Sequence, residues 1–150
     1  MSDDMLLVAA CRDAEAACEL YRQQQLSRAG YPGIRREVIV QLHHLAERDT
    51  TIGALATTLH VTEQDIAQRA GALEARGYLR RIGPQGDIRH RVMQLTAAGR
   101  AAGQLDRRLD AELQQLLTER FGDAQMTAAR LVLTALAAEP TNTDGQGSPY

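Results

Sequence analysis

The sequence predicts a mainly α-helical protein with one small β-hairpin. Apolar residues recur every three or four positions along most of the chain, which is the period of amphipathic helices. One short stretch instead combines two strand-like segments with a turn rich in Gly and Pro. The 150 residues are 44% hydrophobic but include one Phe, four Tyr and no Trp, so aliphatic side chains must build the core. At this length a single domain is the default expectation.

Two helices are expected before residue 50. Residues 3–28 form the first, which carries a single narrow apolar stripe, and such a stripe is typical of contact with another helix, including one from a second subunit. The stripe consists of Leu7, Cys11, Ala14, Cys18 and Tyr21. The segment Gly30–Gly33 breaks the chain, and a second helix follows at about residues 34–47.

A helix-turn-helix pattern comes next. A short helix at about residues 52–59 is joined by three residues to a helix at about 63–76. Thr62 is a good N-cap for this second helix, and Asp65 stands in the place of the capping-box acid. Gly77 is expected to end the helix. Two helices joined by so short a link form a helix-turn-helix.

An arginine-rich hairpin is predicted directly after it. Residues 78–82 and 89–95 have the composition of strands, and Gly83–Asp87 has that of a turn. Four arginines are expected on this ribbon, namely Arg80, Arg81, Arg89 and Arg91. A helix-turn-helix followed by such a hairpin indicates a winged helix. Thr96 then caps a long helix, a last helix spans about 124–138, and residues 139–150 have the composition of a disordered tail.

Positive charge is concentrated in the middle of the chain. The net charge is −2 overall, but residues 51–100 hold seven arginines against four acids, whereas both flanking thirds are net negative. Binding to nucleic acid depends on local positive charge, because particular phosphates must be neutralised. The charge distribution therefore favours a nucleic-acid partner for the central region.

The run from about Val38 to Arg100 resembles the MarR family of bacterial regulators. Gly77-Tyr78-Leu79-Arg80-Arg81 is similar to the family's "G-L-V-x-R" strand, and Asp87-Ile88-Arg89 to its "D-x-R" wing signature. Leu95-Thr96-Ala97-Ala98-Gly99 is similar to the "L-T-x-x-G" segment that opens the following helix. The order and spacing of these segments carry the resemblance, since none of them is specific alone.

The resemblance implies a homodimeric, DNA-binding transcriptional regulator, acting as a ligand-responsive repressor at a pseudo-palindromic operator. It implies dimerisation helices at residues 1–33 and 97–138 and a DNA-binding region at 34–96. A recognition helix would enter the major groove, Arg89 would reach the minor groove, and Asp87 would support the wing. The residues then expected to bind DNA are Thr62, Gln64, Gln68, Arg69, Arg76, Arg80, Arg81, Arg89 and Arg91.

The expected recognition helix departs from the family pattern. Its first turn carries Glu63 and Asp65, which favour the helix but would lie near DNA phosphates. Two interpretations follow. In the first interpretation the helix still reads DNA: Gln64 and Gln68 bind adenine edges, or an acid accepts a hydrogen bond from cytosine, while arginines elsewhere supply affinity. Alternatively, the protein is a winged-helix module for protein interaction or ligand sensing that no longer binds DNA well.

Other residues suggest chemistry more weakly. Cys11 and Cys18 are candidate redox thiols, since a peroxide-sensing branch of the same family uses a Cys in its first helix, although small packing residues are the simpler interpretation. His43 and His44 are adjacent and do not share a helix face, so no metal site is expected. No enzyme motif, cofactor motif, signal peptide or membrane span is evident, which predicts a cytoplasmic non-enzyme. A small aromatic or anionic effector is a further possible partner.

Overall fold

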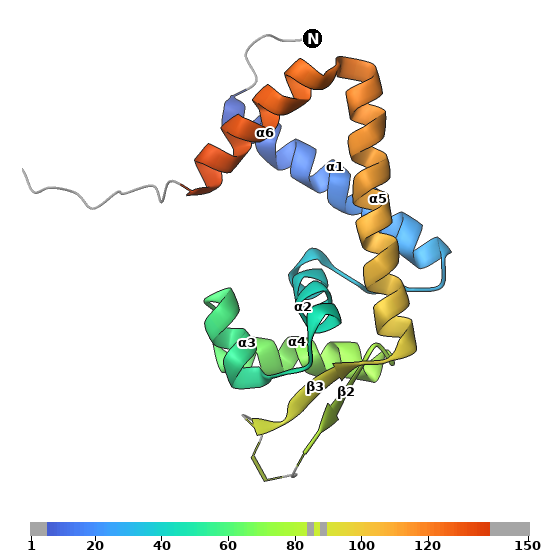
Figure 1. The fold of residues 1–150 in the computed structure, drawn as a ribbon, viewed down its shortest axis with the longest axis vertical. Coiled ribbons are helices and arrows are strands. Elements are labelled where there is room, and N and C mark those ends of the chain that lie inside the picture. The colour runs from blue at the N-terminus through green and yellow to red at the C-terminus, as the bar shows by residue number, and fades with distance from the viewer. Residues whose placement is uncertain (1–5, 84–85, 88–89, 139–150) are drawn as a thin grey trace, which may run out of the picture. The chain divides into compact units, whose positions relative to one another are not determined.

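The computed structural model describes residues 6–83, 86–87 and 90–138. The chain divides into two compact units, Met1–Leu109 and Asp110–Tyr150, which are described separately below. The elements, in chain order, are α1 (Leu7–Arg28), α2 (Arg36–Glu47), β1 (Thr50–Thr51), α3 (Ile52–Leu59), α4 (Glu63–Ala75), β2 (Leu79–Ile82), β3 (Val92–Leu95), α5 (Ala97–Phe121) and α6 (Asp123–Ala138) (Figure 1). The prediction of a mainly helical chain with a small hairpin is confirmed.

A three-stranded antiparallel sheet lies in the first unit, with the strand order β1-β3-β2. In the hairpin, Arg80 lies opposite Gln94 and Arg81 lies opposite Met93. The short strand β1 pairs with the other edge of β3 and was not predicted from the sequence. Because β1 is two residues long, it leaves no alternating pattern in the sequence that could have revealed it.

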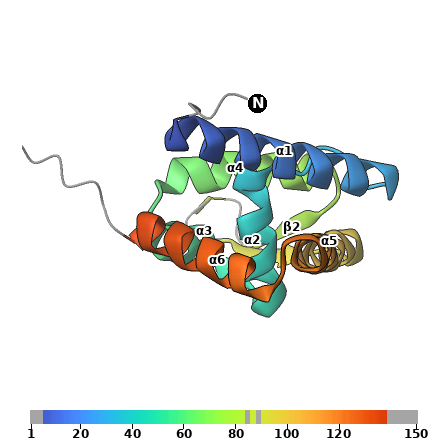
Figure 2. The same ribbon diagram turned by 90° about the horizontal axis from the view of Figure 1, so that it is seen from above.

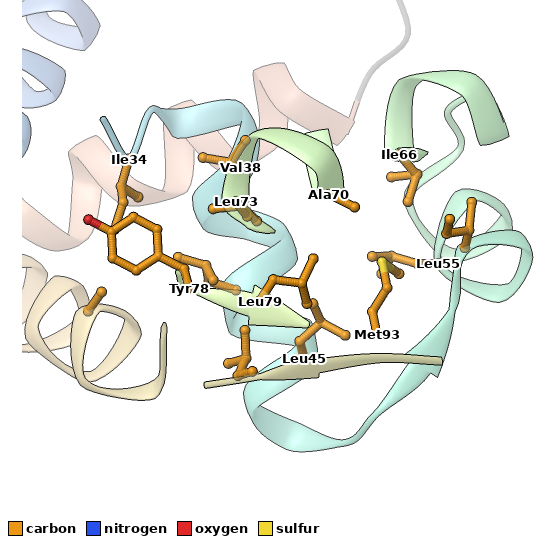
Figure 3. Packing of buried hydrophobic residues seen from close by; sticks show 14 of the residues in the cluster. Ile34, Val38, Leu45, Leu55, Ile66, Ala70, Leu73, Tyr78, Leu79 and Met93 are labelled. Carbon is orange, nitrogen blue, oxygen red and sulfur yellow. The ribbon is translucent and has the colours of Figure 1, made fainter. Parts of the chain in front are cut away.

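The hydrophobic core of the first unit joins α2, α3 and α4 to one face of the sheet (Figure 3). Helix α2 runs across α4 rather than beside it, as the two ribbon views together show (Figures 1 and 2). Ile66, Ala70 and Leu73 of α4 are buried in this core, as their spacing predicted. Leu26, at the end of α1, is also buried, so the first helix is anchored to the core at its C-terminal end.

A close backbone contact positions the start of α5. Thr96 accepts a hydrogen bond from the Gly99 N–H at 3.2 Å, so the predicted cap is present, and its hydroxyl donates to the Gly77 carbonyl at 2.6 Å. The Thr96 N–H donates to the Tyr78 carbonyl at 3.1 Å. A Cβ added to Gly99 would lie 2.1 Å from that carbonyl oxygen. The glycine therefore lets α5 begin directly against the strand that follows α4.

The second unit contains the C-terminal part of α5 and helix α6. Although α6 is 16 residues long, none of its residues is buried within the chain. Large apolar side chains on it are at least half exposed, namely Leu131, Val132, Leu133 and Leu136. Apolar area exposed to this extent is typical of a surface that packs against another molecule.

Candidate nucleic-acid interface

Helices α3 and α4 form a tight helix-turn-helix. The hydroxyl of Thr51 caps α3 by accepting from the Ala54 N–H at 3.2 Å. Helix α3 ends at His60, which adopts the left-handed conformation at φ 54° and turns the chain toward α4. Thr62 then caps α4 as predicted, because its hydroxyl accepts from the Asp65 N–H at 3.1 Å. Both helix starts are thus held by side-chain caps.

The outward face of α4 is polar but uncharged. Gln64 and Gln68 are exposed and lie one turn apart on the face opposite the buried Ile66. Gly71 and Ala72 continue this face, and a Cβ added to Gly71 would meet no atom within 4 Å. Among the residues predicted for this helix, Gln64 and Gln68 are therefore presented to solvent together with the exposed cap residue Thr62.

The two arginines predicted for the recognition helix lie elsewhere. Arg69 is half-buried and donates to the Glu37 carbonyl at 3.3 Å, so its guanidinium points toward α2. Arg76 follows the last residue of α4, and its guanidinium lies over Gly33, where an added Cβ would be 2.3 Å from Cζ. At 1.5 Å per residue, Arg76 is about 18 Å along the helix from Gln64. Arg69 is thus turned away from the outward face, whereas Arg76 is exposed at the end of the helix.

The hairpin arginines also differ from one another. Arg80 is exposed, and its Nε donates to Gln94 Oε1 at 2.6 Å, while Gln94 in turn donates to Asp49 at 2.9 Å. Arg81, the next residue on β2, projects from the opposite face because side chains alternate along a strand. Its Nε donates to Glu74 Oε2 at 2.7 Å, which compensates its charge. Arg80 and Arg81 both lie on the hairpin as expected, but they project from opposite faces of it, and of the two only Arg80 is exposed.

The far end of the hairpin is only partly described. Arg89, the residue implied at the wing tip, lies outside the described residues, so its predicted contact remains a prediction. An Asp87 carboxylate oxygen lies within hydrogen-bonding distance of His90 Nδ1, three residues further on, which is consistent with its predicted support of the hairpin. Arg91 is half-buried and also makes an interaction with the rest of the protein.

A charged network behind the interface was not predicted from the sequence. Asp106 of α5 is nearly buried, with 7% of its side chain exposed. Arg22 of α1 donates to its Oδ1 at 3.0 Å, and His43 Nε2 of α2 lies 3.1 Å from its Oδ2. Arg22 also binds Glu19. Three helices distant in sequence are thus joined through one carboxylate.

The network changes the ionisation of its members. Burial opposes the charged form of Asp106, but the hydrogen bonds from His43 and Arg22 outweigh it and lower the pKa of Asp106 below its usual value. The pKa of Glu19 is lowered in the same way, because contacts with Arg22 and Gln23 outweigh its burial. The pKa of Arg22 is raised, since its two carboxylate partners outweigh the burial of its charge.

The candidate redox and metal residues are not gathered into a site. Cys11 is half-buried and Cys18 is exposed, and both thiols are free. Tyr31 packs against Tyr78, with ring centroids 6.5 Å apart. Within residues 6–83, 86–87 and 90–138, no group of three His, Cys, Asp or Glu side chains is placed to hold a metal ion. No helix in that part of the chain is long and apolar enough to span a bilayer.

Together, α2, α3, α4 and the β1-β3-β2 sheet make this a winged helix-turn-helix protein. Comparison with solved structures finds the same arrangement in MarR-type transcription regulators, so the chain has the fold of that group. No protein-family model matches the sequence, and no curated protein does. The family resemblance predicted from the wing and its flanks is thus confirmed at the level of the fold.

Three solved structures illustrate the similarity. The MepR–DNA complex of S. aureus is 18% identical, with a TM-score of 0.70 over 89% of this chain and 98% of that one. The transcriptional repressor CouR bound to a 23-mer DNA duplex is 24% identical, with a TM-score of 0.68 over 88% and 92%. The reduced form of MarR from E. coli is 18% identical, with a TM-score of 0.66 over 90% and 98%.

Proposed function

We propose that this protein is a homodimeric, DNA-binding transcriptional regulator of the MarR type. The observation that carries the proposal is the exposed polar face of α4, which a capped helix-turn-helix presents and which is followed in the chain by a hairpin that bears the exposed Arg80. An α-helix fits the major groove, and a cationic hairpin beside it contacts the phosphate backbone. Solved proteins of the same fold include MepR and CouR in DNA complexes, which supports the same partner for this chain.

Dimerisation is supported by apolar surface on helices outside the winged helix. Leu6, Leu7 and Val8, at the start of α1, are each more than 60% exposed. Helix α6 independently exposes its leucines and Val132, as described above. Isolated exposed leucines are ordinary, but apolar clusters at both ends of the chain favour burial against a second subunit. A two-fold symmetric dimer would place two copies of α4 on successive turns of a duplex.

A small aromatic effector is supported by an open groove of about 390 Å³ in the first unit. The groove is lined by Glu15, Arg36, Glu37, Leu59, Val61 and Arg69. Arg36 is paired with Glu15, and Glu37 lines the groove together with Arg69, so the charges of the groove balance. Its aliphatic side chains, Leu59 and Val61, would contact an apolar ring. Such an effector would relieve repression if it bound more tightly to a conformation that fits DNA poorly.

The competing function is a winged-helix module for protein interaction or ligand sensing without DNA affinity. One observation favours it: the exposed face of α4 carries no cation, while Glu63 and Asp65 occupy the first turn. The two functions differ in one measurable property, which is salt-dependent binding to duplex DNA.

Selection of bound duplexes from a random library at low ionic strength tests the proposal. The wild-type protein is expected to enrich a pseudo-palindrome with half-sites about one helical turn apart. Arg89→Ala should weaken binding to that site, whereas Arg12→Ala removes an exposed guanidinium on α1 and should leave binding unchanged. If no sequence is enriched and no salt-dependent binding is measured at low ionic strength, the regulator proposal is wrong and the interaction module is favoured.

A further inference from the structure

We propose that Gln64 and Gln68 select A·T base pairs, and that α4 reads bases without neutralising phosphates. Sequence preference and salt-dependent affinity would then reside in different elements, the recognition helix and the hairpin. This inference rests on the proposed function, because it specifies what the same interface recognises.

The first argument is the position of the two amides. Gln64 and Gln68 are both exposed, and their four-residue spacing separates them by about 6 Å along the helix axis. Neither side chain makes a hydrogen bond to any other residue in the part of the chain that the structure describes. The rise of about 6 Å between them covers nearly two base-pair steps of about 3.4 Å each. Two amides so placed reach neighbouring base pairs within one half-site.

The second argument is chemical. A glutamine amide offers one acceptor and two donors, and it matches the adenine edge, where N7 accepts and the N6 amino group donates. Ala72 lies one turn further along the same exposed face, and alanine makes apolar contact with the thymine methyl group. The same face offers no guanidinium or ammonium group to bind guanine O6 and N7 in the described structure. Its chemistry therefore favours A·T over G·C pairs.

The third argument is the position and pairing of the charged side chains of α4. Arg69 is half-buried against the Glu37 carbonyl, and Glu74 is bound to Arg81. The remaining charged residues of the helix are Glu63 and Asp65, and neither supplies a positive charge for a phosphate. Since counterion release requires cations at phosphates, α4 adds little to the salt dependence of binding. That dependence must come from residues outside the helix, of which Arg80 is the exposed example on β2.

The experiment combines selection with salt titration. Duplexes selected from a random library are sequenced for the wild type, Gln64→Ala and Gln68→Ala, and affinities for the best site are measured by fluorescence anisotropy at several salt concentrations. The wild-type half-site should contain adenines at the positions facing the helix. Each glutamine variant should lose about tenfold or more of the preference at one position, since a bidentate contact discriminates by about 1–3 kcal/mol.

The salt slope separates the two roles. Gln64→Ala and Gln68→Ala should leave the slope of log K against log salt unchanged, whereas Arg80→Ala should reduce its magnitude by about 1 per half-site. Gln104→Ala, an exposed glutamine on α5, is the matched control and should change neither quantity. Circular dichroism melting should show that all variants fold, because both α4 glutamines are exposed.

The outcomes distinguish this inference from the proposed function. If the wild type selects no sequence, the proposed function itself fails. If it selects a palindrome whose helix-facing positions are G·C, the proposed function stands, and an acid accepting from cytosine replaces the glutamine readout. Retention of the A·T preference by both glutamine variants would also overturn the inference.

Discussion

Replacement of Gly99 by alanine should destabilise the protein, although the same change elsewhere in a helix stabilises it. Gly99 has no positive φ and lies in the first turn of α5, where intrinsic helix propensity alone favours alanine by about 1 kcal/mol. However, the new Cβ would lie 2.1 Å from the Tyr78 carbonyl oxygen and 3.1 Å from its carbon. Real Cβ atoms do not approach so closely, so the backbone of α5 or β2 must move.

The magnitude follows from what that movement disrupts. Overpacking a well-packed site costs about 1–3 kcal/mol, and the upper end applies because the obstacle is backbone rather than a flexible side chain. The Tyr78 carbonyl also accepts from the Thr96 N–H, and loss of that hydrogen bond costs about 1 kcal/mol. After subtraction of the gain in helix propensity, Gly99→Ala should lower the free energy of unfolding by about 3 kcal/mol.

Gly71→Ala is the matched control. Gly71 is also helical, but an added Cβ there meets no atom within 4 Å, so the substitution should raise the free energy of unfolding by up to about 1 kcal/mol. Urea denaturation followed by circular dichroism, at one fixed protein concentration, measures both changes as shifts of the midpoint. The reasoning is refuted if Gly99→Ala is as stable as the wild type, or if both variants shift in the same direction.

Three further predictions concern buried and capping groups. Because the pKa of Asp106 is lowered by folding, its stabilisation is complete above the unfolded pKa of about 4 and is lost as the pH falls through the lower folded value. Asp106→Asn should therefore lower the free energy of unfolding by about 3 kcal/mol at pH 7 and by much less near pH 2. If urea denaturation shows the same difference between variant and wild type at both pH values, this prediction is wrong. Gln41 is 1% exposed, and in the described structure its amide has no hydrogen-bond partner. Gln41→Met should therefore raise the melting temperature and increase the free energy of unfolding by up to about 2 kcal/mol. A lower melting temperature would show that the amide is satisfied in the folded protein. Thr62→Ala should cost about 1 kcal/mol by removing the cap of α4, while Thr62→Ser should retain most of it in the same thermal melts.

The sequence predicted those parts of the fold that local chemistry determines. Thr62 and Thr96 cap their helices as expected, since a hydroxyl three residues before an N–H needs no distant partner. The left-handed Gly77, at φ 80°, ends the α4 segment as predicted. The inward face of α4 also follows from its spacing alone. These features explain why the order of the helices and of the two hairpin strands was predictable from one sequence.

Contacts between distant residues could not be predicted in this way. Arg22 and Asp106 are separated by 84 positions, and nothing in either segment indicates that they meet. The arginines show the same limit. Glu74 precedes Arg81 by seven residues, so both members of the ion pair were visible in the sequence. Their contact could not be predicted, because it depends on where α4 ends and on the direction of β2. A count of basic residues therefore overestimated the cations available to DNA.

The consequence is a change in how the interface would work. A cationic ribbon would bind any duplex tightly and would leave the recognition helix a small share of the affinity. In the structure, Glu74 neutralises Arg81 and Arg69 points toward α2, while Arg76 stays exposed at the end of α4. With fewer cations available, non-specific binding should be weak, because it depends on phosphate neutralisation alone. Discrimination between sites would then depend more on the uncharged amides of α4. Weak non-specific affinity and a marked A·T preference would be two consequences of the same arrangement of charges.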